Sequence, residues 1–359
     1  MENDLNSTIM FGDDYELWSK HYKTFKKYED RFENFMGKRV KTLVRNKNLL
    51  YIPDSSKLKT HNHFPCNYFL GNKKALFYSL RKYYELNGKD PFQYMPTTFH
   101  ISKGVDDPEY RHFLTLFEEL TEKKKKKETL NIWILKPGEF TNRGKGITVC
   151  PSLDDIKVRL KGREKCTKGK LRTFILQRYI EKPLLYNKRK FDIRHFMLMT
   201  CVNGKFKGYW FNEGYIRTSS FEYNNKNCKD LYTHLTNDSI QQNCQDYGKY
   251  EKGNKLSYSE FQKYLAQHSR KPKAEEEKSD FYKSILPQMK AIAKDTMEAT
   301  FMHLSPKRLE HNFELFGLDF MLDENFNVYL IEVNTNPCLE ISCPLLSRIL
   351  PSLIENLFK

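Results

Sequence analysis

Three side chains near the C-terminus, Asp319, Glu332 and Asn334, have the oxygen atoms and the spacing that suit a divalent metal ion. They belong to two apolar, β-forming segments separated by turn residues, a pattern that predicts a β-hairpin. Asp319 then stands opposite Glu332, and Asn334 shares the face of Glu332 because side chains alternate along a strand. Opposed carboxylates repel and are costly to bury, and a cation removes that cost. Oxygen-only ligands favour Mg²⁺, which commonly takes one or two carboxylates together with substrate phosphates. The alternative is a solvent-facing hairpin with unrelated charges.

The register of this hairpin depends on its turn. Its strands are predicted at Leu315–Leu322 and Val328–Asn334, with Glu324–Asn327 as the loop. In that arrangement Asp323 pairs with the first residue of the second strand, Val328, and all other pairs follow from this one.

A glycine-rich loop in the middle of the chain offers a place for phosphates. Asn131–Leu135 and Ile147–Cys150 have the pattern of strands, and Gly144, Lys145 and Gly146 lie between them. A Walker A loop and a Rossmann turn both lead from a strand into a helix, so this loop is neither. A glycine-rich hairpin loop can close over phosphates through its backbone N–H groups, and a lysine adds positive charge. A lysine-containing surface hairpin is the alternative.

A further polar pair lies on a strand predicted within residues 188–202. Asp192 and Arg194 alternate there with Ile193 and His195, so the two charged side chains share one face and suit the floor of a polar cleft. A structural ion pair is the alternative. His195 lies in an apolar run and is predicted to be a core residue rather than a ligand.

The elements that must position these groups are helices and strands in a mixed order. Amphipathic patterns of period 3.6 indicate the helices, and short apolar, β-forming runs indicate the strands. Further strands are predicted at 49–52, 94–101, 174–180 and 208–217, and helices at 14–36, 73–86, 108–127, 257–266, 278–303 and 345–358. The order indicates a helix-rich N-terminus, a mixed middle and a mostly antiparallel sheet with helices.

Composition limits the classes of protein to consider. The chain has 359 residues, which suggests two or three domains, and a net charge of +16, which implies an acidic partner. No zinc-finger spacing, RNP-type motif or basic-leucine repeat accompanies that charge, so no specific nucleic-acid binding is expected, although the lysine run 123–127 leaves a nucleic-acid binder as an alternative. The eight scattered cysteines, the lack of a signal-peptide core and the lack of a membrane-spanning apolar run predict a soluble intracellular protein with free thiols.

Several motifs occur in an order that resembles one known family. WILKP and RGKGI are followed by LQRYIEKPLL, RKFDIR, HLTN, FGLDF and LIEVNTNP. Over roughly residues 62–358 this ordered set resembles the tubulin tyrosine ligase and tubulin tyrosine ligase-like family. The resemblance implies an α+β, ATP-grasp fold in which two α+β lobes enclose ATP. It also implies three units: a small helix-rich N-terminal domain at 1–62, a central lobe at 63–181, and a C-terminal lobe with the metal-binding hairpin at 182–359.

The resemblance also assigns roles to single residues. The implied metal ligands for Mg²⁺ are Asp319, Glu332 and Asn334, with Glu332 counted as catalytic. Arg194 would stabilise a tetrahedral oxyanion as a catalytic residue on the amino-acid side, and Arg217 would clamp the carboxylate of the incoming amino acid. The implied ATP-binding residues are Lys73, Lys136, Gly144, Lys145, Gly146, Ile147, Gln177, Arg178, Tyr179, Ile180, Lys190, Asp192, Thr236 and Asn237.

The activity that the resemblance implies is an ATP-dependent ligase that adds an amino acid to the acidic C-terminal tail of tubulin, as a dimer or in microtubules. ATP and Mg²⁺ are the implied cofactors, and an acyl phosphate is the implied intermediate. Tyrosine is the first choice of amino acid because the segment NEGYIRTSS…HLTNDSIQ…DYGKYEKGN looks most like tyrosine ligase itself. A polyglycylase or polyglutamylase, or a non-catalytic tubulin-binding protein, are the alternatives. The expected location is the cytoplasm, on microtubules or in the cilium, with no membrane partner.

Overall fold

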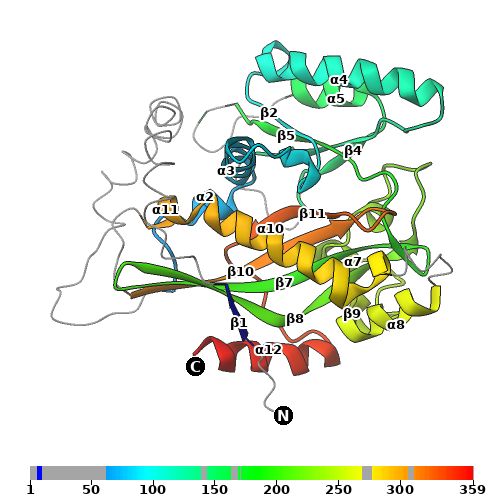
Figure 1. Cartoon of the computed structure of the whole chain (residues 1–359). Coiled ribbons are helices and arrows are strands. Elements are labelled where there is room, and N and C mark those ends of the chain that lie inside the picture. Colours follow the sequence, from blue (N-terminus) through cyan, green and yellow to red (C-terminus); the bar gives the residue numbers. More distant parts are fainter. Residues whose placement is uncertain are drawn as a thin grey trace.

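The structure is a computed structural model that describes residues 6–9, 62–138, 144–162, 169, 171–268, 277–305 and 311–358. The helix predicted at 14–36, the strand predicted at 49–52 and almost all of the predicted N-terminal domain lie outside these residues. Two antiparallel sheets, each covered by helices, form the described part of the chain, so the predicted α+β fold class is confirmed (Figure 1).

The larger sheet has seven strands. Its main path runs β1–β8–β7–β10–β11, while β6 pairs with β7 and β9 pairs with β8, and every pair is antiparallel. The strands are β1 (Asn6–Ile9), β6 (Leu185–Tyr186), β7 (Arg189–Val202), β8 (Lys205–Glu222), β9 (Lys255–Ser257), β10 (His311–Leu322) and β11 (Val328–Asn334).

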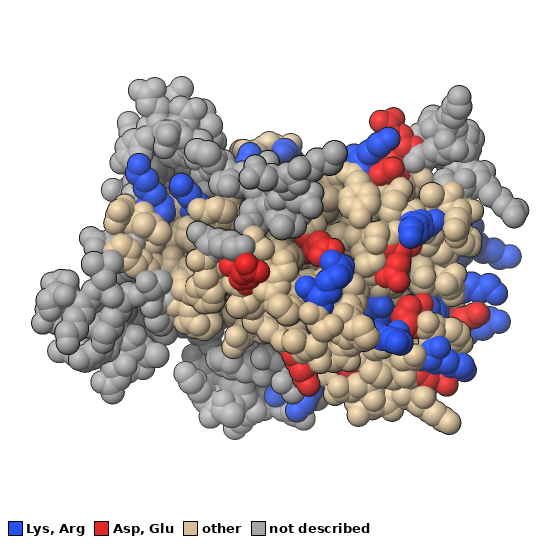
Figure 2. Space-filling model, turned by 90° about the horizontal axis from the view of Figure 1, so that it is seen from below, with Lys and Arg blue, Asp and Glu red and all other residues tan. Residues whose placement is uncertain are grey.

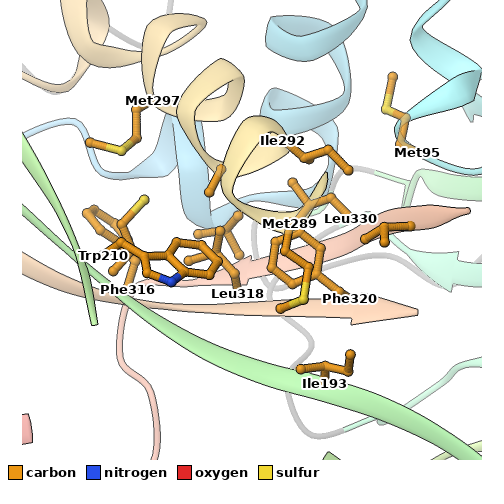
Figure 3. Packing of buried hydrophobic residues seen from close by; sticks show 14 of the residues in the cluster. Met95, Ile193, Trp210, Met289, Ile292, Met297, Phe316, Leu318, Phe320 and Leu330 are labelled. Carbon is orange, nitrogen blue, oxygen red and sulfur yellow. The ribbon is translucent and has the colours of Figure 1, made fainter. Parts of the chain in front are cut away.

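Helices cover both faces of this sheet. On one face lie α3 (Lys73–Leu86) and α10 (Leu286–Glu298), and on the other face lies α12 (Pro344–Leu357) (Figure 1). Met289 and Ile292 of α10 point toward Phe316 and Phe320 of β10 in one apolar core (Figure 3). The opposite face buries Leu346, Ile349, Leu350 and Leu353 of α12 against the sheet. Because both faces are covered, β7 and β10 are apolar along most of their length, and a charged residue in them needs a partner.

The smaller sheet has the strand order β2–β5–β3–β4. Its strands are β2 (Thr98–Ile101), β3 (Trp133–Pro137), β4 (Thr148–Cys150) and β5 (Phe174–Arg178). Two helices, α4 (Pro108–Lys125) and α5 (Leu153–Lys161), cover its outer face (Figure 1). Phe113 of α4 and Ile156 of α5 are buried in the same core as Trp133. Asp107 and Ser152 accept backbone N–H groups at the two helix N-termini.

Short elements connect the two sheets and complete the chain. They are α2 (Tyr68–Gly71), η1 (Pro91–Gln93), η2 (Gly104–Asp106), α6 (Leu231–His234), α7 (Asp238–Gln241), η3 (Lys252–Asn254), α8 (Tyr258–His268), η4 (Phe281–Ile285) and α11 (Phe301–Leu304). None of the helices within the described ranges is long and apolar enough to cross a membrane.

Most predicted elements of the described residues are present, but several have other bounds; for example, the strand predicted to begin at Leu315 begins at His311, and the one predicted at 131–135 lies at Trp133–Pro137. The strand predicted at 94–101 begins only at Thr98, since Pro96 lacks an N–H and a turn of 3-10 helix precedes it. The helix predicted at 278–303 is divided into pieces: Asp280 is extended, η4 then runs directly into α10, and α10 ends at Glu298 before the short α11. The strand predicted to end at Arg217 continues to Glu222. The helix α5 was not predicted.

The hairpin of β10 and β11 has the predicted partners at its centre but not at its turn. Asp319 pairs with Glu332, as predicted, whereas Val328 pairs with Leu322 and not with Asp323. A β-bulge after the Asp319 pair shifts the register by one residue. The physical reason is at the turn, where the Asp323 carboxylate accepts the backbone N–H groups of Asn325 and Asn327, both at 2.9 Å. The Asp323 backbone N–H donates to the Asn327 carbonyl oxygen at 3.1 Å, so the loop closes on Asn327 rather than on Val328.

Candidate active site

A pocket of about 930 Å³, including its open mouth, lies between the two sheets. Strands β3 and β5 of the smaller sheet contribute to one wall, strands β7, β10 and β11 of the larger sheet contribute to the other, and α3 adds Lys73. The pocket therefore collects residues that are up to 261 positions apart, from Lys73 to Asn334.

Most of the residues that the sequence singled out line this one pocket. They are Lys73, Lys136, Gly144, Lys145, Ile147, Gln177, Arg178, Tyr179, Ile180, Lys190, Asp192, Thr236, Asn237, Asp319, Glu332 and Asn334. Three others, Gly146, Arg194 and Arg217, do not line it. Gly146 follows Lys145 directly, and the two arginines are bonded to carboxylates of the lining residues.

The glycine loop approaches its neighbours too closely for larger residues. Gly144 and Gly146 both have a φ of +74°, which side chains rarely adopt. A Cβ on Gly144 would lie 2.6 Å from Ile240 Cδ1, and one on Gly146 would lie 2.8 Å from Pro137 Cγ. The close fit leaves the backbone of this loop at the pocket wall, where its N–H groups can meet an anion.

Two carboxylates face each other on the opposite wall. Asp319 is 2% exposed, and Glu332 lies across from it at 21% side-chain exposure, with Lys73 Nζ 3.5 Å from its Oε2. Asn334 Nδ2 lies 3.4 Å from Asp319 Oδ2, which leaves the amide oxygen for a cation. The described residues contain no group of three or more His, Cys, Asp and Glu side chains that could hold a metal ion. The two carboxylates and the amide nevertheless fit Mg²⁺, because this ion commonly completes its shell with substrate phosphates and water.

One of these two carboxylates, Asp319, also belongs to a buried charge network of two arginines and two aspartates. Arg194 Nε donates to Asp319 Oδ1 at 2.5 Å, and Arg217 donates to Asp192 Oδ1 at 2.8 Å and lies 2.9 Å from Asp319 Oδ2. Although burial opposes it, the two guanidinium groups hold the pKa of Asp319 well below its usual range. Burial raises the pKa of Asp192 in spite of Arg217. The network balances two positive and two negative groups, which is what allows it to be buried.

This network differs from the pair considered in the sequence. Asp192 and Arg194 do share a face of β7, but each bonds across to a neighbouring strand rather than to the other. Asp192 faces Arg217 of β8, and Arg194 faces Asp319 of β10. His195 is fully buried, its Nδ1 lies 2.9 Å from Tyr258 Oη, and it is a core residue, as predicted.

Two buried lysines line the same pocket, Lys136 from β3 of the smaller sheet and Lys190 from β7 of the larger sheet. Lys136 Nζ donates to Gln177 Oε1 at 2.8 Å, and Lys190 Nζ donates to Tyr179 Oη and to the His234 carbonyl oxygen, both at 2.8 Å. Burial lowers the pKa of Lys136 to about 8 and that of Lys190 to about 7. Two buried ammonium groups in one pocket suit a polyanionic ligand, which would supply negative charge beside them.

The sequence assigned no role to His234 or to the apolar part of the pocket, which consists of Pro96, Ile134, Pro137, Leu235, Met321 and Ile331. Alternation would have found Ile134 and Met321, since each is two residues from a predicted site residue on the same strand. Alternation could not find Ile331, because it neighbours Glu332 and only the bulge brings both to the pocket.

Two sheets that enclose a pocket of lysines, glycines and opposed carboxylates define a protein of the ATP-grasp class. A comparison with family models agrees, because the model described as the tubulin-tyrosine ligase family matches residues 53–359. The chain belongs to the tubulin-tyrosine ligase family.

Curated relatives of the chain carry tubulin-modifying names. Tubulin glycylase 3B of Drosophila melanogaster is 34% identical over 63% of this chain, and tubulin glycylase 3D of Tetrahymena thermophila is 33% identical over 64%. Tubulin polyglutamylase TTLL5 of Homo sapiens is 28% identical over 84% of this chain. The matches cover only 28%, 21% and 22% of the lengths of these three relatives.

Proposed function

We propose that this protein is an ATP-dependent ligase that attaches an amino acid to the acidic tail of tubulin. The observation that carries the proposal is the pocket, in which buried lysines and a glycine loop face opposed carboxylates, in a chain of this family. The lysines suit the phosphates of ATP, and the carboxylates suit Mg²⁺, whose part when bound is to neutralise phosphate charge.

The pocket residues divide into three groups by their chemistry. Lys73, Lys136 and Lys190, with the glycine loop at Gly144–Gly146, would hold the phosphates. Segment 177–180 and the Thr236–Asn237 pair, beside the apolar side chains, would hold the base and the sugar. Asp319, Glu332 and Asn334 would hold the metal ion.

The reaction follows from the need to activate a carboxylate. The acceptor carboxylate attacks the γ-phosphate of ATP, and the bond to the β-phosphate oxygen breaks, giving an acyl phosphate and ADP. The amine of the incoming amino acid then attacks the acyl carbon, and phosphate leaves with the amide bond formed. Arg194 would stabilise the tetrahedral oxyanion, and Arg217 would bind the carboxylate of the amino acid. Both arginines are already oriented by Asp319 and Asp192.

The amino acid is proposed to be glycine or glutamate. Relatives named as glycylases and as polyglutamylases support these two, whereas tyrosine, the first choice from the sequence, has no support among them. The cytoplasm and its microtubules, including those of cilia, are the proposed location. The division of the chain into three units, with boundaries after residues 62 and 181, stays a proposal.

Lysines and arginines are interspersed with acidic side chains on the face shown in Figure 2. The described residues of that face therefore offer an acidic tail no uniformly basic surface.

The direct test is ATP-dependent incorporation of labelled glycine, glutamate and tyrosine into tubulin. We expect glycine or glutamate to be incorporated, in proportion to ADP formed. Incorporation of tyrosine alone would identify a tyrosine ligase instead. No incorporation of any label together with retained binding to tubulin would favour the non-catalytic tubulin-binding alternative.

Nucleotide binding should take up protons. The depressed pKa values of about 7 for Lys190 and about 8 for Lys136 mean that both amines lose charge as the pH rises above these values. A phosphate beside them raises both pKa values, so the affinity for ATP should be highest below pH 7 and fall between pH 7 and 9, by up to about tenfold per pH unit for each proton. Calorimetry in two buffers of different ionisation enthalpy measures the uptake. Lys190→Arg stays charged and should take up fewer protons; an unchanged uptake would contradict the assignment.

A further inference from the structure

Lys190 is held from behind by two groups that have not been given any part in holding the phosphates. Its Nζ donates to Tyr179 Oη and to the backbone carbonyl of His234, and it lies 4.3 Å from the centre of the Tyr179 ring. Tyr179 Oη in turn lies 2.8 Å from His234 Nδ1. Lys190, Tyr179 and His234 are all buried and all line the pocket.

The direction of these hydrogen bonds is fixed by a carbonyl group at the far end. His234 Nε2 lies 3.0 Å from the Asn227 carbonyl oxygen, which can only accept, so Nε2 carries the hydrogen. Burial and the charge of Lys190 lower the pKa of His234, so the ring is neutral and Nδ1 is an acceptor. The Tyr179 hydroxyl must therefore donate to Nδ1, and its oxygen is left to accept from Lys190.

We propose that Tyr179 and His234 are positioning residues that hold the amine of Lys190 in place for the phosphates of a nucleotide. A lysine side chain is flexible, and fixing it before the ligand arrives lowers the cost of binding. The Tyr179 hydroxyl oxygen and the His234 carbonyl oxygen both accept from Nζ and so fix its position. The His234 side chain contributes only by orienting the Tyr179 hydroxyl. This inference rests on the proposed function, since it assumes that ATP is the ligand.

The chain contains a matched control for this arrangement. Tyr258 Oη lies 2.9 Å from Nδ1 of the fully buried His195, and neither residue lines the pocket. Tyr179→Phe and Tyr258→Phe thus each remove one buried hydroxyl that is bonded to a histidine Nδ1, and only the first also removes an acceptor from Lys190.

The test is calorimetric titration of the full chain with MgATP. Tyr179→Phe should weaken binding by about ten- to 150-fold, the range for a lost hydrogen bond to a charged group, whereas Tyr258→Phe should change it less than about twofold. His234→Leu should also weaken binding, and His234→Asn, which restores an acceptor at the position of Nδ1, should recover most of the affinity. In ligation assays the effect should be on the KM for ATP and not on that for the amino acid.

The outcomes separate the two proposals. If the wild type binds MgATP and Tyr179→Phe binds it equally well, or if both Tyr→Phe variants weaken it equally, the positioning role is wrong and the ligase proposal stands. If the folded wild type does not bind MgATP at all, both are wrong. Thermal melting of each variant distinguishes weak binding from a failure to fold, and Tyr179→Phe, which keeps the ring, is the variant that carries the decision if His234→Leu does not fold.

Discussion

Glu332→Gln should reduce amino-acid ligation by at least about a hundredfold while the protein stays folded. The substitution keeps the size of the side chain and removes the charge that faces Asp319 across the hairpin. Removing one electrostatic group from a phosphoryl-transfer site raises the activation free energy by about 3 kcal/mol or more, which corresponds to at least this loss in rate. Glu332 is partly exposed and its ion pair with Lys73 is long, at 3.5 Å, so the free energy of unfolding should change by less than about 1 kcal/mol.

The matched control for this substitution lies on the turn of the same hairpin. Glu324 is exposed and lies 3.2 Å from Lys182, outside the pocket. Glu324→Gln removes an equal charge, and we expect ligation to remain at the wild-type rate. Normal turnover in Glu332→Gln would rule out its proposed part in holding the metal ion.

Arg217→Ala should lower the free energy of unfolding by about 3–5 kcal/mol, because it leaves Asp192 and Asp319 buried beside a single guanidinium group. Chemical denaturation measures this loss. The control is Arg348→Ala, since Arg348 forms a surface ion pair with Glu213 at 2.7 Å and should contribute no more than about 1 kcal/mol. Equal effects of the two substitutions would show that the buried network is not stabilising.

The role of Arg217 toward the amino acid needs a milder change than alanine. Arg217→Lys keeps the positive charge and loses the forked geometry that a carboxylate prefers. If Arg217 clamps the incoming amino acid, this variant should raise the KM for the amino acid far more than the KM for ATP. Equal changes in the two KM values would remove the clamp role and leave the arginine as a structural partner of the aspartates.

The hairpin shows how much a local pattern can predict. Its two strands and the pairing of Asp319 with Glu332 follow from alternation and from the turn residues, and the structure has both. The predicted pairing of Asp323 with Val328 is wrong, because the Asp323 carboxylate caps the turn and a bulge makes up the difference. An alternation argument assumes a regular strand, so it places the central pair correctly without revealing the bulge.

The charge network could not be predicted, for a different reason. Arg194 and Asp319 are 125 residues apart in the chain, and only the register between β7 and β10 makes them neighbours. Period and propensity describe one strand at a time and contain no information on which strands pair. The apolar wall at Leu235 and Ile331 was missed likewise, because nothing in the local sequence distinguishes an apolar residue that lines a pocket from one that lies in the core.

The bulge in the hairpin gives β11 one residue more than its partner strand needs. Leu330 and Val333 both pack in the core, and between them Ile331 and Glu332 both face the pocket, so two successive residues point the same way. Deleting Ile331 would restore a regular strand in which Leu330 still pairs with Phe320 and Glu332 still pairs with Asp319, so the core and pocket faces would both be kept. Residue 331 should therefore tolerate exchange for other apolar side chains, and its loss should remove one apolar side chain from the pocket wall while Glu332 and Asn334 stay in register with Asp319.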